Sequence, residues 1–287
     1  MNYIEYQEKV NEIAKKAILP PLGKTAFVVI DMLNDGCREG GAFDLMGFDI
    51  SLFQKIENNI ADLVNECKKY RVPIIYVTSY YDDIYIPYQM KMKFKEMCIE
   101  HIPLAQKGTW GVEFVDSLPQ INDYRVVKSH FSAFARGFSF AFKERSNQAV
   151  DEYLKKPAKQ DEELKKQGLP VLNDFYLKAS ANESELSLKG TYSFMDSLPD
   201  FAPLTLHALL QRDKIDTLIC TGGSSHVCLA STVYSASEKG YNIILPIDAI
   251  ASEDNIKHWI YLHNFSLFNS ALCTTTNLID TILKQYG

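Results

Sequence analysis

Three side chains that could share a reaction stand where predicted strands end. Asp31 closes an apolar run that begins at Thr25, Lys128 closes a shorter run, and Cys228 follows a third run within the segment TGGSSHVC. A thiolate can attack a carbonyl carbon while a neighbouring cation stabilises it and a carboxylate carries the proton. The residue types and positions therefore indicate nucleophilic catalysis by a cysteine.

Cys228 has a physical reason to be reactive. A free thiol with a pKa near 8.5 is only about 3% thiolate at pH 7, and half ionisation requires roughly 2 kcal/mol of preferential stabilisation. The cation of Lys128 and a helix N-terminus both favour the thiolate. A helix predicted over residues 227–239 would begin at Cys228, which suits this cysteine better than the other five. We expect the pKa of Cys228 to be lowered.

Each of these residues also has a structural explanation when it is considered alone. Asp31 could cap a strand end, Cys228 could be a core thiol, and Lys128 could be solvated. A second lysine, Lys189 in the segment KGTYSF, is an alternative to Lys128, but no strand pattern precedes it. The combination at strand ends favours catalysis by Asp31, Lys128 and Cys228.

Strand and helix patterns alternate along the segments that must position these residues. The strand candidates are residues 25–31, 72–78, 124–128, 216–221, 241–245 and 271–275, and helical patterns cover residues 4–18, 52–70, 227–239 and 252–268. Continuous apolar strands between helices predict an α/β fold, a three-layer αβα sandwich around a mainly parallel, Rossmann-like sheet of about six strands. In such a fold the functional crevice lies beyond the carboxyl ends of the strands.

One region interrupts the alternation. Residues 136–203 contain no clear strand–helix unit, and their middle is dense in Lys and Glu. Large apolar residues at regular spacing are few there, which does not favour an independent domain. We expect residues 1–287 to form a single domain with an insertion at about 136–203, acting as a lid or a subunit contact.

Composition narrows the class of protein. The 287-residue chain is 46% hydrophobic and 23% charged, as is typical of a globular protein with its own core. A net charge of −6 gives no basic surplus for nucleic acid. No apolar run reaches the length of about 18 residues that predicts a membrane span, and no secretory signal is recognisable. Six cysteines without paired spacing indicate free thiols in a reducing cytoplasm.

The chain resembles the isochorismatase-like cysteine hydrolases, which include nicotinamidases and N-carbamoylsarcosine amidase. The resemblance lies in separate blocks in the family's order: VVIDMLND around Asp31, KGTWGVEFVDSLP, VVKSHFSAF around Lys128, and DTLICTGGSSHVCLASTVYSASEKGYNIILPIDAIAS around Cys228. It implies that Asp31 is the acid/base, Lys128 the thiolate stabiliser and Cys228 the nucleophile. It also implies a cis peptide between Gly223 and Ser224, with the N–H groups of Ser224 and Cys228 forming the oxyanion hole.

The sequence departs from the family pattern in ways that bear on function. Gly36 stands where the family commonly has phenylalanine, and the SAFxxT block is split by the insertion. The aspartate–histidine set of the nicotinamidase metal site is missing after the second strand, so we expect no metal and no cofactor. The cysteine favours cleavage of a C–N bond, because the ether-cleaving members lack it.

Aromatic and polar residues near the blocks are candidates to line the substrate pocket. They are Phe131, Tyr80, Tyr81, Trp110 and His226. Aromatic faces suit the small flat amides that the resemblance implies as substrates. Each aromatic residue could equally belong to the core, and His226 could be a surface or helix-cap residue.

The sequence predicts a hydrolase that cleaves a small amide, carbamoyl or ureido compound through a thioester. Two alternatives stay open: a family member with weak or no activity that binds or assembles through its insertion, and a hydrolase of an ester or vinyl ether. The expected partner is a small-molecule amide, without nucleic acid or membrane. The resemblance also implies a homo-oligomer, a dimer or tetramer.

Overall fold

The computed structural model describes residues 2–81, 88–97, 99–106, 108–118, 124–135, 139–143, 205–268 and 270–286. Most of the predicted insertion at 136–203, including Lys189, lies outside these residues. Within the described ranges, no helix combines the length and the apolar character needed to cross a membrane.

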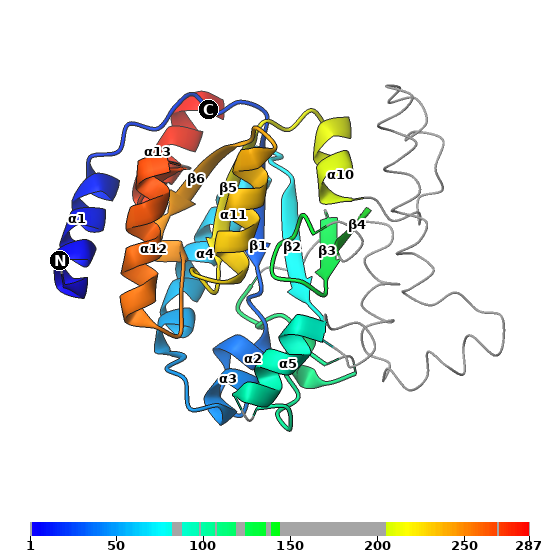
Figure 1. Ribbon diagram of the computed structural model, residues 1–287. Helices are drawn as coiled ribbons and strands as arrows, with labels where there is room; N and C mark the ends of the chain where they lie inside the picture. Colours follow the sequence, from blue (N-terminus) through cyan, green and yellow to red (C-terminus); the bar gives the residue numbers. More distant parts are fainter. Residues whose placement is uncertain are drawn as a thin grey trace, which may run out of the picture.

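A seven-stranded sheet forms the centre of the molecule (Figure 1). Its strands are β1 (Thr25–Ile30), β2 (Ile74–Ser79), β3 (Tyr124–Lys128), β4 (Ser139–Lys143), β5 (Thr217–Gly222), β6 (Asn242–Pro246) and β7 (Ala271–Cys273). The spatial order is β4-β3-β2-β1-β5-β6-β7, and every neighbouring pair is parallel except β3 and β4. The predicted α/β fold with a mainly parallel sheet is confirmed.

The strand β4 was not predicted from the sequence. It lies at the edge of the sheet, where Ser139 pairs with Lys128 and Lys143 pairs with Tyr124 in antiparallel register. As an edge strand, β4 pairs with β3 alone. The region that we interpreted as lacking strands therefore begins with one.

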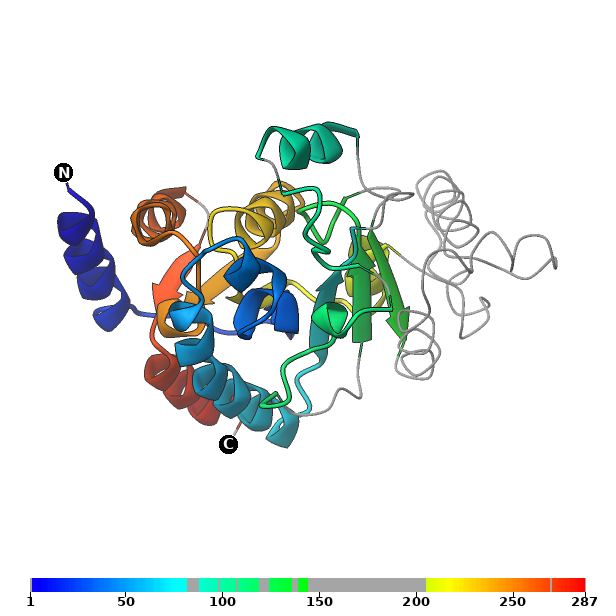
Figure 2. The same ribbon diagram turned by 90° about the horizontal axis from the view of Figure 1, so that it is seen from below.

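Helices cover both faces of the sheet (Figures 1 and 2). The longer ones are α1 (Tyr3–Lys15), α4 (Ser51–Lys69), α5 (Tyr88–Glu96), α11 (Cys228–Glu238), α12 (Asn255–Phe268) and α13 (Thr275–Tyr286). The short ones are α2 (Asn34–Cys37), α3 (Ala42–Leu45), α10 (Leu206–Arg212) and the 3₁₀ turns η1 (Trp110–Val112) and η2 (Ile247–Ala249). Buried residues of α1, α10, α11 and α12 share one core cluster, and those of α4 and α13 share the other.

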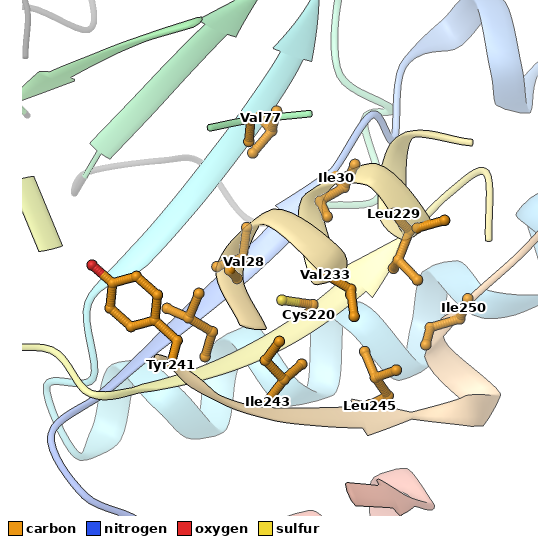
Figure 3. Close-up of a cluster of buried hydrophobic side chains, with 14 of the residues drawn as sticks. Val28, Ile30, Val77, Cys220, Leu229, Val233, Tyr241, Ile243, Leu245 and Ile250 are labelled. Atoms are coloured by element: carbon orange, nitrogen blue, oxygen red, sulfur yellow. The ribbon is translucent and has the colours of Figure 1, made fainter. Parts of the chain in front are cut away.

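Strand side chains alternate between these two clusters. In β1, Val28 and Ile30 belong to the cluster under α11, whereas Phe27 and Val29 belong to the cluster under α4. Figure 3 shows Val28 and Ile30 beneath the α11 side chain Val233 and its neighbours. Because both faces are buried, the strands read as continuous apolar runs, which is why the sequence predicted them correctly.

The last predicted strand is shorter than expected. We predicted it over residues 271–275, but β7 ends at Cys273 and α13 begins at Thr275. The backbone N–H and the hydroxyl of Thr275 both donate to Asp248 Oδ1, at 2.8 and 2.9 Å. These bonds satisfy the first turn of the helix, so the chain turns into α13 rather than extending the strand.

The topology fixes where a site must lie. From β1 the chain adds β2 and β3 on one side, and it later adds β5, β6 and β7 on the other. The order therefore reverses between β1 and β5, and ligands in such sheets bind beyond the strand ends at this switch point. The helices α2, α3 and α5 lie together at that end of the sheet (Figure 1).

Core burial predicts a contrast between two isoleucines. Ile244 in β6 is 0% exposed, whereas Ile18 is 96% exposed. We expect Ile244→Ala to lower the free energy of unfolding by about 2–5 kcal/mol, because it removes buried methyl groups and leaves a cavity. The control Ile18→Ala should change it by about 0.5 kcal/mol or less. Chemical denaturation measures both, and equal losses would contradict the assigned core.

Candidate active site

Four strand ends bring the candidate residues together. Asp31 follows β1, Ser79 ends β2, Lys128 ends β3, and Cys228 begins α11 after the loop that leaves β5. Ser79 and Lys128 are register partners in the sheet. The structure thus brings Asp31, Lys128 and Cys228 together as the sequence predicted, and it adds Ser79 to them.

The ammonium of Lys128 is the centre of this cluster. Its Nζ lies 2.8 Å from Asp31 Oδ2, donates to Ser79 Oγ at 2.6 Å and to Cys228 Sγ at 3.3 Å. An ammonium has three protons, so these three partners use its full donor capacity. The Lys128 side chain is 0% exposed. Because a buried cation is costly without partners, the three contacts hold it at this position.

Tyr81 closes the cluster on a further side. Its hydroxyl accepts a hydrogen bond from Ser79 Oγ at 3.2 Å and lies 3.8 Å from Cys228 Sγ. The ring centroid of Tyr81 is 5.9 Å from Lys128 Nζ, within the range of a cation–π contact. The chain of contacts therefore runs from the ammonium through Ser79 to Tyr81 and back to the sulfur.

The pKa of Cys228 differs in direction from our expectation. Burial raises the pKa of the Cys228 thiol to about 12; the Lys128 cation lowers it, and the Asp31 carboxylate raises it further. The predicted lowering is therefore wrong for the resting site, where burial outweighs the cation. Burial alone would lower the pKa of Lys128, but Asp31 and Cys228 together raise it above its ordinary value. Burial therefore favours the neutral thiol of Cys228 in the resting site.

Two glycines at the end of β5, Gly222 within the strand and Gly223 after it, permit a close approach to neighbouring groups. Gly222 has a φ of 93°, and a Cβ there would lie 2.1 Å from the carbonyl oxygen of Ile30 in β1. A Cβ on Gly223 would lie 2.4 Å from the ring of Phe53. Larger residues would push the loop away from β1, and with it Cys228. The bond between Gly223 and Ser224 is cis, at the position that the resemblance implied.

Three backbone N–H groups between Ser224 and Cys228 are without a backbone acceptor among the described residues. The N–H groups of Ser225, Val227 and Leu229 donate to backbone carbonyls. Those of Ser224, His226 and Cys228 have no such acceptor. Unpaired donors at a helix N-terminus suit a developing oxyanion. This arrangement agrees with the predicted oxyanion hole, which stays a prediction.

A cavity of about 480 Å³ opens directly beside Asp31, Ser79 and Cys228. Of the predicted pocket residues, Phe131, Tyr81 and His226 line it. Tyr80 and Trp110 do not, because Tyr80 is fully buried and Trp110 is half exposed away from the cavity.

Local contacts account for the positions of Tyr80 and Trp110. Tyr80 and Tyr81 are adjacent at the end of β2, and only Tyr81 turns toward the sulfur. The carbonyl of Trp110 accepts a hydrogen bond from Asn34 Nδ2 at 3.1 Å, so η1 supports the loop after β1 through its backbone.

A polar network borders the cavity next to the oxyanion loop. Ser224 Oγ donates to Glu253 and lies 3.2 Å from His226 Nδ1, while His226 Nε2 lies 3.5 Å from Glu253 Oε1. Ser252 Oγ lies 3.0 Å from His226 Nδ1. Glu253 and Ser252 escaped the sequence analysis because the helix predicted over 252–268 included them, whereas α12 begins at Asn255 and both residues lie in the loop before it.

Metal-binding chemistry has no cluster to support it in the part of the chain that the structure describes. No group of three His, Cys, Asp or Glu side chains converges there as metal ligands would.

Comparison with known proteins identifies the family. The Isochorismatase domain model matches residues 25–160 and 198–277, which is most of the chain. The chain belongs to the isochorismatase family. The two matched segments contain Asp31, Lys128 and Cys228, and the break between them falls at 161–197, within the predicted insertion.

Individual relatives of this isochorismatase-family chain extend the comparison. It is 33% identical over 122 residues to the ureidoacrylate amidohydrolase RutB of Caulobacter vibrioides, covering 38% of this chain and 54% of that protein. The chain therefore spans about half the length of the curated relatives it matches.

Solved structures share the fold. A cysteine hydrolase from Pseudomonas syringae pv. phaseolicola superposes with a TM-score of 0.61 at 18% identity, covering 95% of this chain and 99% of that one. N-carbamoylsarcosine amidase from Thermoplasma acidophilum gives 0.50 at 17% identity, covering 88% and 97%.

Cysteine accessibility in this family member predicts selective alkylation. Of the five cysteines that the structure describes, Cys228 lines the cavity, while Cys37, Cys67, Cys220 and Cys273 are 0% exposed in the core, where burial raises the pKa of each. We expect iodoacetamide to modify Cys228 at least tenfold faster than these four, by peptide mass spectrometry. Cys98 lies outside the described residues and is quantified separately. Alkylation of the core cysteines at the rate of Cys228 would contradict the site.

His226 provides an electrostatic test of the polar network. Burial lowers the pKa of His226; Glu253 opposes this, and Lys257 adds to it. Glu253→Gln should therefore lower the pKa of His226 further, because the opposing carboxylate is lost. Lys257→Met should raise that pKa, since a like charge is removed. NMR titration of the His226 ring measures both variants, and shifts of the same sign would disprove the network.

Proposed function

We propose that this chain is a cysteine-dependent amidohydrolase, which cleaves a C–N bond of a carboxamide, carbamoyl or ureido compound. One observation carries the proposal: Lys128 Nζ contacts both Asp31 Oδ2 and Cys228 Sγ at the wall of a cavity. That arrangement gives a nucleophile, an acid/base and a shared counter-ion in one place.

The first step is a proton transfer that leaves the charge of the cluster unchanged. The resting cluster is neutral overall, with the Asp31 carboxylate, the Lys128 ammonium and the Cys228 thiol. Transfer of the thiol proton to Asp31 gives a carboxylic acid, the same ammonium and a thiolate, which is again neutral overall. Because Lys128 is within 3.3 Å of both anions in turn, it stabilises each state without moving. A thiol with a raised pKa can therefore still act as a nucleophile.

The thiolate then attacks the carbonyl carbon of the substrate. The C=O electrons move to the oxygen, and the resulting oxyanion accepts hydrogen bonds from the N–H groups of Ser224 and Cys228. The C–N bond breaks when Asp31 donates its proton to the nitrogen, so ammonia or an amine leaves. The acyl group stays on Cys228 as a thioester.

Water completes the reaction. Asp31, again a carboxylate, takes a proton from water as the oxygen attacks the thioester carbon. The C–S bond breaks, and the proton on Asp31 returns to the sulfur of Cys228. The products are a carboxylic acid and ammonia or an amine, and the cluster is restored.

The relatives support this class of reaction. RutB of Caulobacter vibrioides is named for ureidoacrylate amidohydrolysis, but the match spans about half of that protein. A cytoplasmic location, a dimer or tetramer, and a single domain with an insertion at 136–203 stay predictions. The alternative is a binding or assembly role. It depends on the insertion, most of which lies outside the described residues.

Variants of the three central residues test the proposal. Cys228→Ala, Asp31→Asn and Lys128→Met should each lower kcat/KM for ammonia release by on the order of 10³-fold or more, because the three act as a unit. Cys220→Ala is the matched control, since Cys220 is a fully buried thiol in β5 that does not line the cavity. A thioester mass shift should appear on Cys228 in the wild type.

The activities of these variants distinguish the proposed mechanism from a structural effect of the substitutions. Full activity of Lys128→Met or Cys228→Ala, with the fold verified by circular dichroism, would exclude this mechanism. Loss of activity in Cys220→Ala to the same extent would show that the effect is structural.

A further inference from the structure

The cavity beside Cys228 has two apolar walls. Phe43 in α3 and Phe48 just after it form the first wall, together with Phe53 of α4, and the Phe43 ring packs against the other two with centroids 5.6 and 5.8 Å apart. Phe94 of α5 and Met97, which follows it, belong to the second wall. Ile99 and Leu104 complete this second wall.

Asp35 ties the two walls together. Its carboxylate accepts hydrogen bonds from the N–H of Ala42 at 3.1 Å and from the N–H of Ala105 at 2.6 Å. Ala42 precedes Phe43 of the first wall, and Ala105 follows Leu104 of the second. These two hydrogen bonds fix the positions of the two walls relative to each other. The carboxylate of Asp35 already accepts both of them.

The space between the walls is larger than a minimal amide requires. A cavity of about 150 Å³ accommodates a benzene ring. The cavity here is about 480 Å³. A substrate such as acetamide would leave most of the apolar lining without a partner. Filling this volume takes an apolar group the size of roughly two to three such rings.

The charges of the lining disfavour an anionic substrate. Among the described residues, the acids that line the cavity are Asp31, Asp35, Glu253 and Asp254. The bases are Lys257 and His226, and burial lowers the pKa of His226, which favours its neutral form. The ammonium of Lys257 is paired with Asp254 at 3.0 Å and is 56% exposed. A substrate carboxylate would thus face several acids and one cation that is already paired.

We propose that the substrate is a carboxamide whose acyl part is neutral and apolar, an aryl-alkyl or medium-length alkyl group. This inference rests on the proposed function. The acyl part, rather than the leaving amine, occupies the walls because it remains attached to Cys228 through the thioester. Apolar contacts to it therefore act in both halves of the reaction.

The first test compares chain length and charge in one series. Linear primary amides from acetamide to octanamide should show kcat/KM rising about fourfold per methylene until the cavity is filled. In the monoamide of suberic acid a carboxylate replaces the terminal methyl group of octanamide, and we expect it to react at least tenfold more slowly. Ammonia release measures both, and intact-protein mass spectrometry follows the thioester on Cys228.

A matched pair of variants tests the wall itself. Met97 lines the cavity, whereas Met92 on α5 does not. Met97→Lys should lower kcat/KM for octanamide at least tenfold and raise it for suberic acid monoamide, because it places a cation in an apolar wall. Met92→Lys should leave both values unchanged. Equal effects of the two substitutions would overturn the assignment of the wall.

The outcomes distinguish this inference from the proposed function. If acetamide or the anionic monoamide is the best substrate and the thioester still forms on Cys228, the inference is wrong and the proposed function stands. If an N-alkyl acetamide reacts faster than octanamide, the walls hold the amine side and the inference is also wrong. If no amide releases ammonia or acylates Cys228, the proposed function itself fails.

Discussion

The fold depends at its functional end on one buried cation. Lys128 is fully enclosed, and its ammonium needs partners because charge is costly away from water. Two strands and one helix position those partners: Asp31 directly follows β1, Ser79 ends β2 and Cys228 begins α11. Removal of any of them would leave part of the charge uncompensated. The electrostatic requirement of Lys128 therefore fixes the strand ends relative to the helix that carries the sulfur.

The same cation explains how a buried thiol can be a nucleophile. Burial raises the pKa of Cys228, and Lys128 opposes that effect without overcoming it. In the proposed reaction, Cys228 and Asp31 exchange one proton while the positive charge of Lys128 stays constant. Beyond this polar end the cavity turns apolar, between the two apolar walls. In this account the polar end determines the chemistry, and the walls determine which acyl group reaches it.

The sequence predicted the buried strands and the functional residues at their carboxyl ends. Buried parallel strands read as apolar runs, and the residues after them, Asp31 and Lys128, had to lie at one edge of the sheet. Ser79 was missed because a serine ending a strand carries no signal until its neighbour in the sheet is known. The acidic and apolar linings come from loops and from α5, whose position depends on tertiary contacts such as the hydrogen bonds of Asp35. Burial of Cys228, which decides its pKa, is likewise a property of the packed structure.

The central claim is that Lys128 stabilises the Cys228 thiolate while Asp31 competes with it for the positive charge. The most direct measurement is the ultraviolet absorbance of the thiolate at one fixed alkaline pH, as a difference from the corresponding Cys228→Ala protein. Asp31→Asn should contain more Cys228 thiolate than the wild type, because loss of the carboxylate lowers the pKa of the thiol. Lys128→Met should contain less. A thiolate fraction that is equal in the three proteins, or that follows the reverse order, would contradict the account.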